Sequence, residues 1–188
     1  LFLISGAAIA LAAPEGRLWR FARERTWRLI LPLIFGMFVV VPIQPYCEGV
    51  ANGHLSPGFW SFLVRYWHVH PWPKDSFGGW QYGITWNHLW YLPYLWTYTL
   101  CLVALMPLLG LARVRTGVAA FCRAPTWVVI VAPAALLEFY VLTLDPFFPA
   151  TNAFVGDWYQ HAKYATIFLA GYLLAREAGF WTRVVAIR

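Results

Sequence analysis

The sequence predicts an all-α, polytopic transmembrane helix bundle, and three observations lead to this fold class. Of the 188 residues, 61% are hydrophobic and only 12% are charged, about half of the roughly 25% that soluble domains carry. Twelve Trp and ten Tyr residues suit the membrane–water interfaces, where amphipathic rings gather. Arginines cluster in the short gaps between apolar stretches, a pattern typical of cytoplasmic loops in membrane proteins.

Five stretches are interpreted as membrane segments, because a spanning helix needs about 20 mainly apolar residues. They cover residues 1–13, 29–45, 89–111, 127–144 and 158–175. We expect the first of them to be the tail of a helix that is cut at its start. The chain is therefore expected to be an internal fragment of a longer protein. It would form a single transmembrane domain over 1–188 that is incomplete at both ends.

The charges in the gaps predict which helix ends face the cytoplasm. The first gap holds five arginines against two acids, the gap after residue 111 holds three arginines and no acid, and the chain end holds three arginines against one acid. The two alternate gaps are balanced or acidic. Every basic gap thus falls on one side, as a multi-pass topology requires. This bias accounts for the net charge of +6, so no nucleic-acid partner is expected.

The gap over residues 46–87 is predicted to be an extracytoplasmic, aromatic-rich loop region. It carries eleven aromatic side chains and three histidines, and a disordered loop in water would not be so aromatic. Long loops are often functional or have structure of their own. We expect this region to lie on the membrane surface or to cap a cavity.

Two arginines at a spacing of three, Arg25 and Arg28, form the first candidate site. Both can project from one face of a helix start, and guanidinium groups bind phosphate oxygens in a bidentate way. The pair could therefore hold the phosphates of a cytoplasmic donor such as a coenzyme A thioester. The alternative is ordinary topogenic charge at a membrane edge.

Two more candidates lie in or beside apolar segments. His88 precedes the third segment, where it could serve as general base toward a hydroxyl or simply form an interfacial hydrogen bond. Glu138 is the one carboxylate deep within an apolar segment. Because an ionisable side chain is costly to place inside a membrane, its presence there indicates a functional role. Its expected partner is His88 or His161, and the alternative is a protonated carboxyl or one that reaches the interface.

Asp157 and His161 are spaced four apart at the start of the last segment. They could form a local pair at the helix start, and Asp157 could instead be an N-cap. His68 and His70 are one residue apart, but no third ligand with recognisable spacing stands nearby, so no metal site is expected. On the predicted topology the three cysteines fall at different depths, so no disulfide is expected.

Six stretches together resemble the membrane-bound acyltransferase 3 family (membrane-bound O-acyltransferases). They are FLISGA (2–7), RTWRLILPLIFGM (25–37), PIQPYCE (42–48), HLWYLPYL (88–95), DWYQH (157–161) and FLAGY (168–172). Within the family they are most similar to the glucans biosynthesis protein C type, which is linked to succinylation of periplasmic glucans. The order of the stretches carries the resemblance, and it spans most of the chain.

The resemblance implies a multi-pass enzyme of the bacterial inner membrane that moves an acetyl or succinyl group from acyl-CoA to a hydroxyl of an extracytoplasmic glycan. Arg25 and Arg28 match the family's Arg-x-x-Arg, which is associated with donor binding. The family's principal catalytic His would lie upstream of residue 1, so this fragment alone is expected to be inactive. Acyl-CoA would be a co-substrate, and no bound cofactor is expected.

From residue placement and this resemblance we expect His88 and Glu48 to be catalytic, orienting or polarising the acceptor hydroxyl. Glu138, Asp157 and His161 are expected to contribute to substrate binding, and the aromatic loop to offer flat faces to a sugar. The alternative function is a transporter for a glycan or a lipid-linked sugar without acyl transfer, which an intramembrane Glu and kinked helices would also suit. A membrane scaffold without a ligand is a third interpretation.

Overall fold

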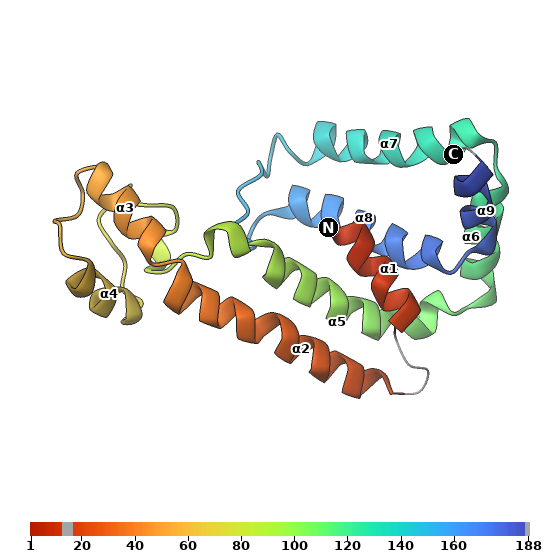
Figure 1. Cartoon of the computed structure of the whole chain (residues 1–188). Helices are drawn as coiled ribbons and strands as arrows, with labels where there is room; N and C mark the ends of the chain where they lie inside the picture. Colours follow the sequence, from red (N-terminus) through yellow and green to blue (C-terminus); the bar gives the residue numbers. More distant parts are fainter. Residues whose placement is uncertain (13–16, 187–188) are drawn as a thin grey trace. The chain divides into compact units, whose positions relative to one another are not determined.

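The computed structural model describes residues 1–12 and 17–186, and within them the chain is all-α, with no strand. The predicted fold class is confirmed. In chain order the helices and helical turns (Figure 1) are α1 (Phe2–Ala12), α2 (Leu18–Phe35), the π-helical turn η1 (Gly36–Val40), α3 (Ile43–Ala51), α4 (Phe59–Trp67), the 3₁₀ turns η2 (Trp80–Tyr82) and η3 (Asn87–Leu89), α5 (Tyr91–Leu109), α6 (Ala112–Arg123), α7 (Thr126–Thr143), α8 (Trp158–Ala175) and α9 (Ala178–Ala186).

Among the described residues, two helical stretches are long and apolar enough to cross a membrane, Asn87–Leu109 and Thr126–Thr143. A third span results if Leu18–Val40 and Ile43–Ala51, which are bent by 41° at their junction, count as one. The predicted first segment forms α1, which is apolar but shorter. The predicted last segment forms α8, whose first turns carry polar and basic side chains. By length and composition, two or three of the five predicted segments therefore qualify as spans.

The chain divides into two compact units. The first, which we call the helical unit, comprises Leu1–Arg25 and Tyr94–Arg188. The second, which we call the aromatic unit, comprises Thr26–Pro93 and contains the predicted loop region.

In the helical unit, α1 and α8 cross in close contact because glycines stand where the two backbones meet. A Cβ atom added at Gly6 would lie 1.9 Å from the carbonyl oxygen of Phe168, and one added at Gly171 would lie 2.0 Å from the carbonyl oxygen of Leu3. Each glycine is followed four residues later by an alanine. Small residues at this spacing let membrane helices approach closely.

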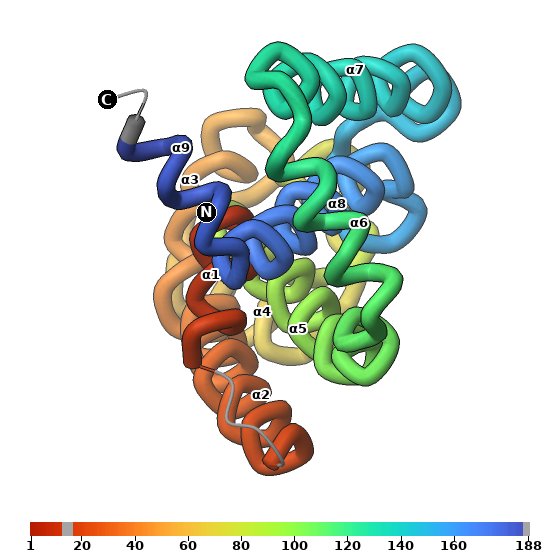
Figure 2. The backbone as a smooth tube through the Cα atoms, turned by 90° about the vertical axis from the view of Figure 1, so that its right-hand side faces the viewer, coloured from red at the N-terminus to blue at the C-terminus, as the bar shows by residue number. Residues whose placement is uncertain are grey.

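α7 and α9 pack directly against α8. α6 runs from the end of α5 to the start of α7 (Figure 2), and it contacts α9. The guanidinium of Arg183 on α9 donates to the carbonyl oxygens of Ala124 and Arg123, which end α6. α7 is joined to α8 by the Tyr140 and Thr166 hydroxyls, 3.2 Å apart.

The aromatic unit has a core built almost entirely of rings. Phe62, Tyr66, Trp72 and Phe77 are buried together, and the partly buried residues packed against them are Tyr46, Leu55, Phe59, Trp80 and Ile84. Ring pairs such as Phe62 and Trp72, with centroids 4.8 Å apart, lie within the range in which aromatic contacts add to area burial. The predicted loop region thus contains two helices, α4 and the end of α3, and a core of its own.

Two buried rings fix the irregular backbone of this unit through their polar atoms. The Tyr66 hydroxyl accepts from the Thr85 amide at 3.0 Å and donates to the Thr85 carbonyl at 3.2 Å. The Trp72 indole donates to the Gly83 carbonyl at 3.1 Å. Because water cannot reach the phenolate, burial raises the pKa of Tyr66 above its ordinary value near 10, although the bond from Thr85 works in the opposite direction.

A π-helical turn separates α2 from α3. The wider turn of a π-helix changes which carbonyls are bonded within the helix, and the Phe38 carbonyl accepts from the Trp67 indole at 2.9 Å. Gly36 in this turn is buried, and a Cβ atom there would lie 2.3 Å from the Leu89 side chain. The predicted segment 29–45 is therefore not one straight helix.

Candidate active site

A buried polar network joins the start of α5 to the start of α8, and Asp157 lies at its centre. The carboxylate, only 1% exposed, accepts from the Tyr94 hydroxyl at 2.5 Å and from the amides of Thr151 and Asn152 at 3.3 and 3.0 Å. Asp157 occupies the N-cap position of α8, but its side chain makes no capping hydrogen bond. It holds the loop before the helix instead.

His161 lies one turn further along α8, and both of its ring nitrogens are engaged. Nε2 is 2.7 Å from the Phe154 carbonyl oxygen, and Nδ1 is 3.0 Å from the Tyr98 hydroxyl. A carbonyl can only accept, so Nε2 carries the proton. When Nε2 holds the one ring proton, Nδ1 accepts from the Tyr98 hydroxyl, which also lies 3.5 Å from the His161 carbonyl oxygen. Tyr98 is thus joined to both the ring and the backbone of His161.

The network is closed by ring contacts and by further backbone bonds. The Tyr94 ring lies 4.8 Å from the His161 ring between centroids, and the Phe154 amide donates to the Tyr94 hydroxyl at 3.0 Å. Tyr98 is buried, with 7% of its surface exposed. The structure thus places Asp157 and His161 in one hydrogen-bonded cluster, which links them through the Tyr94 hydroxyl and the backbone of Phe154. Tyr98 joins the cluster at His161.

Sequence reasoning missed these two tyrosines. Tyr94 and Tyr98 are spaced four apart on α5, which places them on one helix face. A tyrosine pair on one face beside an Asp and His pair on another helix was the available signal. It was hidden because ten tyrosines occur in the chain and most aromatic residues in membrane helices serve packing or interface roles.

Arg25 and Arg28 both lie on α2, which begins at Leu18. The pair is therefore in the middle of a helix, and not at the helix start expected from the sequence. Arg25 is half-buried, with its guanidinium 5.5 Å from the centroid of the Phe21 ring, and Arg28 is exposed. An ion pair joins Arg20 to Glu24 on the same helix, and Arg28 has no carboxylate of the described residues within ion-pair distance.

The predicted catalytic residues His88 and Glu48 belong to the aromatic unit. His88 lies in the turn η3 and is exposed, and Glu48 is exposed on α3, where it accepts from the Gly78 amide at 3.3 Å. In the described part of the chain no hydrogen bond or ion pair connects these two side chains. Asn87, which precedes His88, has a positive φ of 42°, a conformation that is uncommon outside glycine.

Glu138 is exposed on α7. Its predicted partner His161 already uses both ring nitrogens within the polar network. In residues 1–12 and 17–186, no group of three or more His, Cys, Asp or Glu side chains is arranged to hold a metal ion. Cys47, Cys101 and Cys122 are free thiols.

Comparison with known proteins supports one assignment. No curated protein and no solved structure matches the chain. The model of one protein family, described as an acyltransferase domain, matches residues 1–186, which is nearly the whole length. The chain is all-α and has helices long and apolar enough to span a membrane. The match over nearly its whole length shows that the chain belongs to the acyltransferase domain family Acyl_transf_3.

Proposed function

We propose that the chain belongs to an inner-membrane enzyme that moves an acetyl or succinyl group from acyl-CoA to a hydroxyl of an extracytoplasmic glycan, as in glucan succinylation. Family membership supports acyl transfer by a membrane protein. The observation that carries the donor assignment is the arginine pair on α2. Arg28 presents an exposed guanidinium without a carboxylate partner among the described residues, which leaves it available to phosphate oxygens.

In the proposed reaction the acceptor hydroxyl oxygen attacks the thioester carbonyl carbon. The C–O bond forms as the C–S bond breaks, and the hydroxyl proton passes through a histidine base to the leaving thiolate. On this chain we propose that His88 and Glu48 orient or polarise the hydroxyl. Arg25 and Arg28 hold the donor phosphates, so that the thioester is presented at a fixed position.

Asp157, His161 and Glu138 are proposed to contribute to acceptor binding. The hydrogen bonds within the chain favour an indirect role for Asp157, whose oxygens are occupied by Tyr94, Thr151 and Asn152. It would position the loop and His161. Exposed rings of the aromatic unit, Trp60 and Tyr82, are available to stack on a sugar, whereas the core rings are not.

The test measures transfer of label from acetyl-CoA or succinyl-CoA to extracytoplasmic glycan in membranes that contain the full-length protein. We expect Arg25→Gln/Arg28→Gln to lower transfer at least tenfold, mainly by raising KM for the donor. Arg20→Gln/Arg23→Gln is a matched control, because it removes the same charge at the same spacing from the same helix. At 100° per residue, that pair faces a direction about 140° away.

Equal losses in both double variants would assign the arginines to topology alone and would remove the donor site. His88→Asn should lower transfer at saturating donor, whereas His54→Asn, an exposed histidine of the same unit, should not. If folded wild-type protein transfers no label from either donor, acyl transfer from these donors is ruled out. Transport of a glycan or lipid-linked sugar then becomes the function to test.

A further inference from the structure

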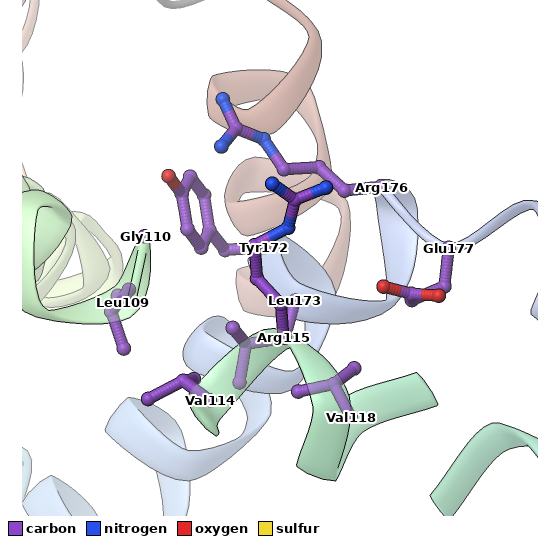
Figure 3. A pocket seen from close by; sticks show the side chains of 9 residues that line it. All are labelled: Leu109, Gly110, Val114, Arg115, Val118, Tyr172, Leu173, Arg176 and Glu177. Atoms are coloured by element: carbon purple, nitrogen blue, oxygen red, sulfur yellow. The ribbon is translucent and has the colours of Figure 1, made fainter. Parts of the chain in front are cut away.

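A pocket of about 250 Å³ lies in the helical unit where α5, α6 and α8 meet (Figure 3). It is formed by the C-terminal ends of α5 and α8 and by the first two turns of α6. The site residues predicted from the sequence contribute nothing to its lining. It is therefore distinct from the arginine pair on α2 and from the polar network around Asp157.

Two guanidinium groups stand on the same side of this pocket. Arg115 from α6 and Arg176 from the end of α8 both line it (Figure 3), and the Arg176 guanidinium is 5.0 Å from the centroid of the Tyr172 ring. Glu177 also lines the pocket. Among the described residues, neither arginine has a carboxylate within ion-pair distance, so the two positive charges outnumber the single acid without being neutralised.

The position of Arg115 is unfavourable for the free protein. It lies in the first turn of α6 (Ala112–Arg123), where the helix dipole disfavours a cation. Arg176, at the end of α8, is stabilised by the dipole of its helix. The helix dipole therefore accounts for the position of Arg176 but not for that of Arg115. An anion held between the two groups would offset both the dipole at Arg115 and the repulsion between like charges.

The rest of the lining is apolar, with Leu109, Val114, Val118 and Leu173 beside the charged groups. Leu109 is also the last residue of the candidate span Asn87–Leu109, so the pocket lies beside the end of that candidate span. From these observations we infer that the Arg115–Arg176 pocket binds the phosphate group of an amphipathic ligand. Guanidinium forks would hold the phosphate, and the apolar wall would hold the adjoining arm.

Two sources of this phosphate are consistent with the lining: the acyl-CoA donor and an anionic lipid. The polar network links the N-terminal turns of α5 and α8. The C-terminal ends of the same two helices line the pocket. The helical rise from His161 to Tyr172 is roughly 17 Å, which is the distance along α8 between the polar network and the pocket. The donor source rests on the proposed function, but the phosphate site does not.

The test uses the full-length protein in nanodiscs. Coenzyme A is titrated in discs of phosphatidylcholine, and retention of phosphatidylglycerol from mixed discs is measured by native mass spectrometry. Wild type is compared with Arg115→Gln/Arg176→Gln and with a control of equal charge, Arg113→Gln/Arg123→Gln, whose side chains lie outside the pocket lining. Val118→Phe fills the pocket without removing charge, and Arg115→Lys/Arg176→Lys keeps charge without the fork.

A loss of coenzyme A affinity of at least tenfold in the pocket variants, and not in the control, establishes the donor source. A comparable loss of phosphatidylglycerol retention establishes the lipid source. The inference is overturned if folded pocket variants bind both ligands as the control does, even if acyl transfer is intact. Lipid retention that depends on Arg115 and Arg176, in a protein that transfers no acyl group, would leave the pocket standing and remove the proposed function.

Discussion

The helical unit and the aromatic unit fix polar backbone in opposite ways. In the helical unit, Asp157 gathers the amides of the irregular loop before α8 onto one carboxylate. In the aromatic unit, the Tyr66 hydroxyl and the Trp72 indole bind single backbone groups from within a core of rings. The loop of the helical unit depends on one charged acceptor, whereas the loops of the aromatic unit are held by several neutral groups. A single substitution should therefore lower stability more in the helical unit than in the aromatic unit.

The largest effect is expected at the α1–α8 crossing of the helical unit. Gly171→Ala places a Cβ atom 2.0 Å from the Leu3 carbonyl oxygen, where backbone faces backbone and no side chain can move aside. We expect a loss of about 3 kcal/mol or more in unfolding free energy. Gly117→Ala on α6, with open space around it, should instead gain up to about 1 kcal/mol. Reversible denaturation in detergent compares them, and equal effects would refute the close crossing.

Removing the central carboxylate should have the next largest effect. Asp157→Ala leaves the Tyr94 hydroxyl and the amides of Thr151 and Asn152 without their acceptor, which costs about 2 kcal/mol or more. Hydrogen exchange should accelerate at 151–154 and leave Thr85 in the aromatic unit unchanged. Glu138→Ala, at an exposed position, should stay within about 0.5 kcal/mol. Equal acceleration of hydrogen exchange at 151–154 and at Thr85 would show that the two units unfold together and do not have independent stabilities.

In the aromatic unit, Tyr66→Phe should cost about 1 kcal/mol near neutral pH, because the Thr85 amide loses its acceptor. The pH dependence sharpens this prediction. Burial raises the pKa of Tyr66 above its ordinary value near 10, so the unfolded chain releases the phenol proton at lower pH than the folded chain. The stability linked to this proton is complete below about pH 10 and is lost as the pH rises toward the raised pKa.

The Phe variant should therefore lack this part of the alkaline loss of stability. Thr85 hydrogen exchange and denaturation between neutral and strongly alkaline pH measure both effects. Tyr82→Phe, where the ring is exposed, serves as the control and should behave as wild type. An alkaline slope that is identical in wild type and Tyr66→Phe would contradict the assigned role of burial.

The smallest expected effect concerns two thiols, one in each unit. Cys122 is buried at the end of α6, and burial raises its pKa, with Glu177 acting in the same direction and Arg183 in the opposite one. Cys47 in the aromatic unit is exposed. Because the thiolate is the reactive form, iodoacetamide at pH 8 should label Cys122 on the order of tenfold more slowly. Mass spectrometry of Cys47→Ser and Cys122→Ser separates the two rates.

Much of the fold could be predicted because hydrophobicity is a local property of the chain. Each of the five apolar stretches contains a helix where one was expected. The bend after residue 40 was not predicted, since a π-helical turn depends on partners such as the Trp67 indole, distant in sequence. The length of α2 was also underestimated, because its first turns are rich in arginine and lack the apolar signal.

The candidate site could be predicted only in part. The spacing of Asp157 and His161 predicted a local pair or an N-cap, and Asp157 does occupy the N-cap position of α8, without a capping hydrogen bond. The tyrosine partners of the two side chains lie 63 residues away, and nothing in the local pattern selects them. The pocket between Arg115 and Arg176 likewise joins residues that the sequence shows only as charges in two separate gaps. In both cases the chemistry depends on which helix faces meet.

By itself, the sequence determined that this protein is all-α with apolar stretches suited to a membrane, because composition, apolar stretches and basic gaps act through the bilayer and not through specific contacts. The acyltransferase family followed from the resemblance of six short stretches, and the match of the family model over residues 1–186 shows it. Tertiary structure alone decided which of the many aromatic rings form a core and which stay exposed, and which arginines share a pocket. The reason is physical. Burial and hydrogen bonding are properties of pairs brought together by packing, and glycines such as Gly6 and Gly171 set how closely the helices approach.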